Sequence, residues 1–220
     1  LMEVVINGRT TLPGNFLVSG QLLSRRNGTA GEGKIRVDYL QVDKQLWLTQ
    51  GAAAGLRFGR VKNPYGLYNV SRGTVFSRPG ITLPASVYFE SSGLRNLFFS
   101  ADAVQPYGYL TDGNVTHEFS ATVARDFDAT EEIGALTLGN GQLKVRDFRG
   151  AQWMSDGFFD RHLTLGLSYL SANLAYLTDD ENDPFRGTEI DANLYVFSAR
   201  WQAQYLSLIH ISEPTRPLYI

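Results

Sequence analysis

The sequence predicts an all-β fold, an antiparallel transmembrane β-barrel of which this chain supplies only a part. Apolar and polar residues alternate with a period of two in four segments, which is the period of a strand with one apolar face. Dipeptides that favour tight hairpins separate these segments. The 220 residues include 22 Gly, 11 Tyr and 13 Phe, a composition that favours strands and turns over helices.

The first clear strand is expected from Lys34 onward. Its side chains alternate between an apolar set and a charged set, which are Ile35, Val37 and Tyr39 against Lys34, Arg36 and Asp38. In a barrel that crosses a membrane, the apolar set faces lipid and the charged set faces the lumen. We therefore expect Arg36 and Asp38 to point inward.

Three later segments alternate in the same way, at residues 115–123, 161–169 and 190–201. In the second, the leucines at 163, 165 and 167 are expected to face outward and Thr164 inward. In the third, we expect Leu194 and Val196 to face lipid and Asp191 and Asn193 to face the lumen, with the strand ending at Trp201.

Turns and loops are expected between these strands. The hairpin signals are Asn7-Gly8, Asn27-Gly28, Asp112-Gly113-Asn114 and Asn140-Gly141. Residues 125–160 look like an irregular insertion with weak strands, and residues 179–187 form a long acidic loop. Short turns that alternate with long polar loops are typical of the two rims of an outer-membrane barrel.

A soluble β-sandwich is the main alternative fold, because its strands also alternate. Sandwich strands run about five or six residues and membrane-spanning strands about 9–11, and the long segment 162–178 favours the membrane. A transmembrane helix is not expected, since no run of roughly 18 apolar residues occurs. Aromatic residues near the expected strand ends would form an interfacial girdle; they are Tyr39, Trp47, Tyr107, Tyr109, Tyr169, Tyr176, Trp201 and Tyr205.

Residues 56–69, which read LRFGRVKNPYGLYN, contain an R-x-G-x-x-K-x-P-Y-G run. This run resembles the strand-then-loop signature of Gram-negative outer-membrane porins of the phosphate-selective and related types. The following residues up to the Ser-Ala-Asp at 100–102 resemble the loop and next strand of such proteins. The resemblance covers about fifty residues and implies a channel for passive diffusion of small hydrophilic solutes across the outer membrane of a Gram-negative bacterium.

The residues of this stretch also predict a loop by themselves. Gly59 and Gly66 relax steric limits, and Pro64, Pro79 and Pro84 deny hydrogen bonds to a sheet. A loop of roughly thirty residues is therefore expected after Lys62, and loops of that length are usually functional. In a wide barrel such a loop can fold inward and narrow the lumen.

The charge of the chain is polarised although its total is only −2, which gives no general attraction for nucleic acid. Residues 54–95 carry a net +5, from Glu90 and six basic residues, and residues 102–191 carry a net −10. The six are Arg57, Arg60, Lys62, Arg72, Arg78 and Arg95.

We expect these six residues, with Arg36, Asp38 and Asp191, to line the pore. Arg57, Arg72 and Arg78 are the predicted selectivity residues, because arginine charges in a narrow lumen favour anions. The alternative is that these basic residues pair with carboxylates of the wall or lie in the water of the rim.

An outer-membrane β-barrel enzyme and a soluble carbohydrate-binding β-sandwich are the alternative functions. The sequence has no G-x-S-x-G, no phosphate-binding Gly-Lys-Thr/Ser and no H-E-x-x-H run, and it lacks cysteine. His162 follows Asp160 but has no evident nucleophile, and a structural role is expected for His117. The acids at 179–183 lack the spacing of a calcium loop. We therefore predict no catalytic residues, no metal and no cofactor.

The two ends of the sequence set the expected domain bounds. Residues 206–216 read LSLIHISEPTR, which is identical to a translation of the transposase adapter used in short-read library preparation. We expect residues 206–220 to be a non-native tail and residues 1–205 to be a partial barrel domain of about eight to ten strands. The expected partners are outer-membrane lipid and small hydrophilic solutes, with a homotrimer as one assembly, and no nucleic acid.

Overall fold

The computed structural model describes residues 2–26, 32–69, 99–128 and 141–202, which form one antiparallel sheet of ten strands. The strands are β1 (Met2–Leu12), β2 (Phe16–Arg26), β3 (Glu32–Leu48), β4 (Ala52–Lys62), β5 (Ser100–Asp112), β6 (Val115–Ala124), β7 (Phe127–Asp128), β8 (Gln142–Gly157), β9 (Leu163–Leu177) and β10 (Glu189–Trp201). Each long strand pairs with its sequence neighbours, and β7 adds a short pairing to β8. The expected all-β antiparallel fold is confirmed.

The sheet curves but does not close within the described residues, because β1 and β10 lie at opposite ends of the strand order. Apart from β7, the strands have 10 to 17 residues, which meets the length of about 9–11 that a tilted strand needs to cross a bilayer. In the described part of the chain, no helix is long and apolar enough to cross a membrane.

The connections at one end of the strands are short, and the opposite end carries longer ones. At one end, which we call the short-turn rim, the strands are joined by residues 13–15, 49–51, 113–114 and 158–162. The last of these contains α2 (Phe158–Arg161), a single turn with left-handed backbone at Phe159 and Asp160. The opposite end, the long-loop rim, holds the connections 63–99 and 178–188.

Of the predicted hairpin turns, one is confirmed and one is wrong. Asp112-Gly113-Asn114 does form the hairpin between β5 and β6, with Gly113 at φ 58°. Asn7-Gly8 does not form a turn, because it lies inside β1 with Gly8 opposite Gly20. Asn27-Gly28 and Asn140 lie outside the described residues, and Gly141 directly precedes β8.

The predicted irregular insertion at 125–160 is also wrong, since β8 occupies 16 residues of it. Its alternation is hidden by a bulge, where the register with β9 shifts between Arg146 and Arg149 and Asp147 adopts φ 51°. The bulge brings Val145 and Phe148 into the same buried cluster although they are three residues apart.

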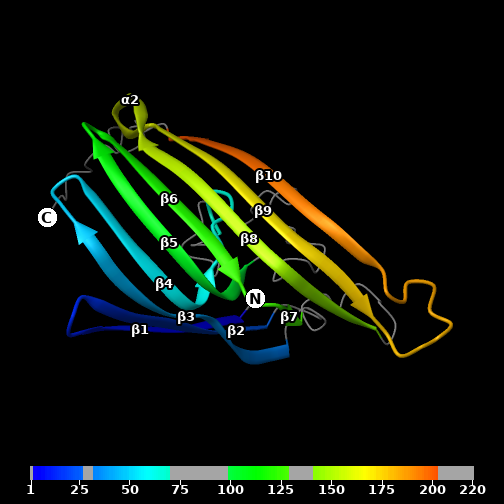
Figure 1. Cartoon of the computed structure of the whole chain (residues 1–220). Coiled ribbons are helices and arrows are strands. Elements are labelled where there is room, and N and C mark those ends of the chain that lie inside the picture. The colour runs from blue at the N-terminus through cyan, green and yellow to red at the C-terminus, as the bar shows by residue number, and fades with distance from the viewer. Residues whose placement is uncertain (1, 27–31, 70–98, 129–140, 203–220) are drawn as a thin grey trace, which may run out of the picture.

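Residues 63–69, which we call the inward segment, turn back from β4 and lie against the concave face of the curved sheet (Figure 1). Tyr65 of this segment packs in a cluster with Val145, Phe148, Leu170 and Val196. The expectation of a loop that folds inward after Lys62 therefore holds for residues 63–69.

The opposite, convex face carries rows of apolar side chains in register. One row crosses β2 to β6 and consists of Val18, Val42, Phe58, Val104 and Val123. A second crosses β6 to β10 and consists of Phe119, Trp153, Leu167 and Phe197. Many of these side chains are exposed, including Phe119 at 51%, Val123 at 61% and Phe197 at 69%. The sheet thus presents its apolar side outward.

The orientation predicted for β10 is reversed in the structure. Leu194 and Val196 lie on the concave face against the cluster that holds Tyr65, whereas Asp191 and Asn193 lie on the convex side with Tyr195. The physical reason is the inward segment, which covers this part of the concave face and makes it apolar. The orientation predicted for β9 is correct, with Leu167 exposed and Thr164 buried.

Candidate functional site

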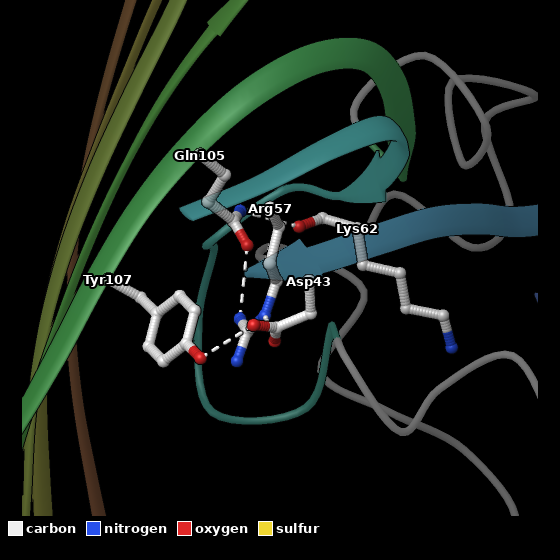
Figure 2. A network of polar contacts seen from close by, with 5 residues as sticks. All are labelled: Asp43, Arg57, Lys62, Gln105 and Tyr107. Atoms are coloured by element: carbon white, nitrogen blue, oxygen red, sulfur yellow. Dashed lines mark hydrogen bonds and ion pairs between the residues drawn. The ribbon is translucent and has the colours of Figure 1, made fainter. Parts of the chain in front are cut away.

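A polar cluster on β3, β4 and β5 is the most developed site on the concave face. Asp43, Arg57 and Gln105 are direct neighbours in the register of these three strands. Arg57 Nε donates to Asp43 Oδ2 at 3.1 Å, and Arg57 Nη1 donates to Gln105 Oε1 at 3.1 Å. Figure 2 shows the guanidinium between the carboxylate and the amide. The charge of Arg57 is therefore partly neutralised and its side chain is held in one orientation.

Tyr107 completes this cluster from β5. Its hydroxyl donates to Asp43 Oδ1 at 2.7 Å, and the Arg57 guanidinium carbon lies 4.0 Å from the centre of its ring. The ring reaches Asp43 by crossing β4 at Gly55, where a Cβ atom would lie 2.5 Å from the ring and from its hydroxyl oxygen. Only glycine at position 55 leaves room for this placement.

A second polar cluster lies nearer the long-loop rim. Asp38 is 4% exposed, accepts from Gln21 Nε2 at 2.9 Å and lies 3.2 Å from Lys62 Nζ. The Lys62 ammonium also lies 5.1 Å from the Tyr39 ring centre and 5.3 Å from that of Phe99. In Figure 2 the Lys62 side chain points away from Arg57. The two basic residues thus belong to separate ion pairs.

Polar side chains continue across the concave face toward β10. Gln105 Nε2 donates to Thr122 Oγ1 at 2.9 Å and to the Lys62 carbonyl at 3.0 Å. On β8 and β9, Gln152 Nε2 donates to Ser168 Oγ at 2.9 Å. Closer to the short-turn rim, Thr164 Oγ1 donates to Asp156 and accepts from Arg200 Nη2 at 3.0 Å. Hydrogen-bonded groups of polar side chains therefore occur on the concave face from β3 to β10, beside the apolar cluster that holds Tyr65.

The structure brings together only some of the predicted pore residues. Arg57 lies with Asp43, and Lys62 lies with Asp38, so these residues form two clusters. Arg36 is exposed on β3, and Asp191 accepts from Asn173 Nδ2 at 3.0 Å on the convex side.

The remaining predicted pore residues are basic. Arg60 is half-buried, and its Nε has no hydrogen-bond partner in the part of the chain that the structure describes. Arg72, Arg78 and Arg95 lie outside the described residues.

The predicted aromatic girdle is found only in part. Trp201 is exposed at the short-turn rim and stacks on His162, with ring centres 5.9 Å apart. The strand-end position predicted for Tyr169 is wrong, because it lies near the middle of β9 on the convex face, with its ring centre 4.9 Å from that of Tyr195 on β10. Tyr107 instead lies in the Arg57 cluster, and Tyr205 lies outside the described residues.

The two histidines that the structure describes occupy different surroundings. His117 Nδ1 lies 2.5 Å from Ser155 Oγ, and its ring stacks on Trp153 with centres 6.3 Å apart. Ser155 is fully buried, so its hydroxyl is not reachable for attack on a substrate. His162 Nδ1 is 2.6 Å from the Gln202 carbonyl. Both contacts have the character of structural hydrogen bonds.

The acidic loop 178–188 hydrogen-bonds to itself. Asp180 Oδ1 accepts from the backbone of Asn182 at 2.9 Å, and Asp183 Oδ1 accepts from that of Phe185 at 2.8 Å. Asp183 Oδ2 also accepts from Tyr176 Oη at 2.7 Å. Among the residues described, no group of three or more His, Asp or Glu side chains could hold a metal ion.

Asp43, Gln105, Gln152 and Ser168 are the site residues that sequence reasoning missed. Asp43 and Gln105 become visible only once the strand register is known, because each lies opposite Arg57 on a different strand. The one local signal was Gly55, a glycine inside a strand, which often marks a close approach by another group.

Comparison with known proteins gives no relative. No family model matches the chain, and no curated protein or solved structure is similar to it.

Proposed function

We propose that this chain is part of a porin-like channel that lets small hydrophilic solutes diffuse passively across the outer membrane of a Gram-negative bacterium. The observation that carries the proposal is the distribution of side chains over the two faces of the sheet. Exposed apolar rows cover the convex face, and hydrogen-bonded polar side chains lie on the concave face beside the inward segment. This is the arrangement of a β-barrel that meets lipid outside and water inside.

The energy of the convex face supports a lipid environment. Full burial of a Val, Leu or Phe side chain is worth about 1.5–3 kcal/mol. Side chains that are half exposed or more, such as Phe119, Val123 and Phe197, would lose much of that gain in water. In contact with acyl chains they recover it, and the convex face then needs no other cover.

The two alternative functions have less support. In a soluble carbohydrate-binding sandwich a second sheet would cover the apolar face, yet Leu167 is 48% exposed and Phe119 lies open beside it in the described sheet. For an enzyme, the described His117–Ser155 pair has its hydroxyl buried. The exposed apolar face and the buried hydroxyl therefore favour a channel over both alternatives.

The selectivity of the proposed channel depends on how the basic residues are compensated. Arg57 and Lys62 each lie beside a carboxylate, so these two pairs add little net charge to the wall. A preference for anions would then come from Arg72, Arg78 and Arg95, together with the part of the Arg57 charge that Asp43 does not neutralise. Neutralising Arg57, Arg72 and Arg78 together should shift the reversal potential toward cations in planar bilayers.

The orientation of the sheet can be tested with two neighbouring positions at the middle of β6. Phe119 lies on the convex face and Ser120 on the concave face. A Phe119→Arg change should destabilise the protein in lipid vesicles by about 2–4 kcal/mol, as for arginine at the bilayer midplane, whereas Ser120→Arg should cost much less and lower the conductance.

The full-length protein that contains this chain should give ohmic conductance steps when it is reconstituted in planar bilayers. Absence of conductance, or equal tolerance of arginine at positions 119 and 120, would contradict the proposal.

A further inference from the structure

The inward segment is fastened to strands far away in the sequence. The Gly66 amide donates to Ser168 Oγ on β9 at 3.0 Å, and the Gly66 carbonyl accepts from Gln152 Nε2 on β8 at 2.8 Å. Gln152 also donates to Ser168 Oγ at 2.9 Å. The main chain of one residue is therefore held by two side chains that also bind each other.

Two glycines of the sheet lie beside this contact. A Cβ atom on Gly150 would lie 2.8 Å from Leu170 Cδ2 and at an ordinary 3.6 Å from Pro64 Cγ, and one on Gly166 would lie 3.3 Å from Leu67 Cδ2. Both glycines lie on the concave face in the rows that flank Gln152 and Ser168. The absence of a side chain at Gly166 lets Leu67 approach β9 closely, and the absence of one at Gly150 leaves room for Leu170, which belongs to the same buried cluster as Tyr65.

The segment is also anchored by its own residues. Tyr65 is 1% exposed in the cluster with Phe148 and Leu170. Asn69 Nδ2 donates to the Asn63 carbonyl at 2.7 Å and to the Phe99 carbonyl at 3.0 Å, which ties the two ends of the segment together. The contacts thus extend along the whole segment.

We propose that Gly150, Gln152, Gly166 and Ser168 form a seat that holds the inward segment permanently against the wall and so fixes the width of the lumen. These four are positioning residues, and the inward segment is a fixed constriction that does not move as a gate. The proposal rests on the channel function for its effect on width, whereas the contact between seat and segment stands without it.

The test uses two seat variants and two matched controls. Ser168→Ala removes the acceptor of the Gly66 amide, and Gly166→Val places methyl groups against Leu67. Ser19→Ala on the concave face of β2 and Gly8→Val on β1, where a Cβ would meet nothing within 4 Å, are the controls. Amide hydrogen exchange at Gly66 and single-channel conductance are measured for each variant in the refolded full-length protein.

Ser168→Ala should speed exchange at Gly66 by about three- to tenfold, as expected for the loss of one hydrogen bond. Gly166→Val should also speed it, because the added methyl groups push Leu67 and its segment away from β9. Both variants should add current noise or substates. The controls should change neither quantity. Exchange that stays at the wild-type rate in both seat variants would overturn the seat. Faster exchange with unaltered conductance would overturn its role in setting the width, and faster exchange in a protein that never conducts would refute the channel while leaving the seat in place.

Discussion

A Gly55→Ala substitution should destabilise the protein although alanine normally suits a strand better than glycine. The new Cβ would lie 2.5 Å from the Tyr107 ring and hydroxyl, which is too close for the ring to stay where it is. Because these atoms lie at the far end of the side chain, the ring can swing away. It then loses its hydrogen bond to Asp43 and its contact with Arg57.

The size of the effect follows from the contacts that are lost. A hydrogen bond to a charged group is worth about 1.5–3 kcal/mol, and a guanidinium over a ring about 0.5–2 kcal/mol. Alanine regains about 0.5–1 kcal/mol over glycine in a strand. We therefore expect Gly55→Ala to lower the free energy of unfolding by about 1–4.5 kcal/mol.

The assay is urea unfolding of the protein in lipid vesicles, followed by the fluorescence of its three tryptophans. Gly8→Ala is the control, because a Cβ at Gly8 meets nothing within 4 Å, and it should stabilise slightly. In a Tyr107→Ala background, Gly55→Ala should become as harmless as Gly8→Ala. If Gly55→Ala is tolerated like the control, or its cost does not depend on Tyr107, the placement of the ring across β4 is wrong.

Two further perturbations test the wall and its packing. Asp43→Asn leaves the Arg57 charge uncompensated. An anion that passes at about 5–10 Å would then be stabilised by about 0.2–0.5 kcal/mol in 0.1 M salt, so the reversal potential should move toward anions. The control, Asp191→Asn on the convex side, should leave the reversal potential unchanged. Tyr65→Ala removes a fully buried aromatic side chain and should lower the free energy of unfolding by about 3–5 kcal/mol, measured by urea unfolding. A loss below about 1 kcal/mol would show that the inward segment contributes little to the packing of the sheet.

The strands that the sequence predicted are those whose two faces differ in polarity. Residues 115–123 and 161–169 alternate cleanly; the first lie in β6, and the second lie in β9 from Leu163 onward. The strand β8 was missed because its bulge at Asp147 breaks the period of two. Its alternation is regular only on either side of that residue.

The direction of β10 could not be predicted, because alternation identifies two faces but not which one lies inside. Val196 faces inward only because the inward segment meets it through Tyr65, and that contact joins residues more than a hundred positions apart. The pairing of Arg57 with Asp43 likewise depends on register between strands. The sequence therefore predicted the sheet and the basic residue at its centre, but not the carboxylate that balances it.

The contacts of Gly66 also constrain the order in which the chain can assemble. Hairpins such as β5–β6 join residues close in sequence and can form early. Gly66, however, binds Gln152 and Ser168, which follow it by 86 and 102 positions. The inward segment can be captured only after β8 and β9 have paired, so it docks in a late step of folding, when most of the surrounding sheet has already formed.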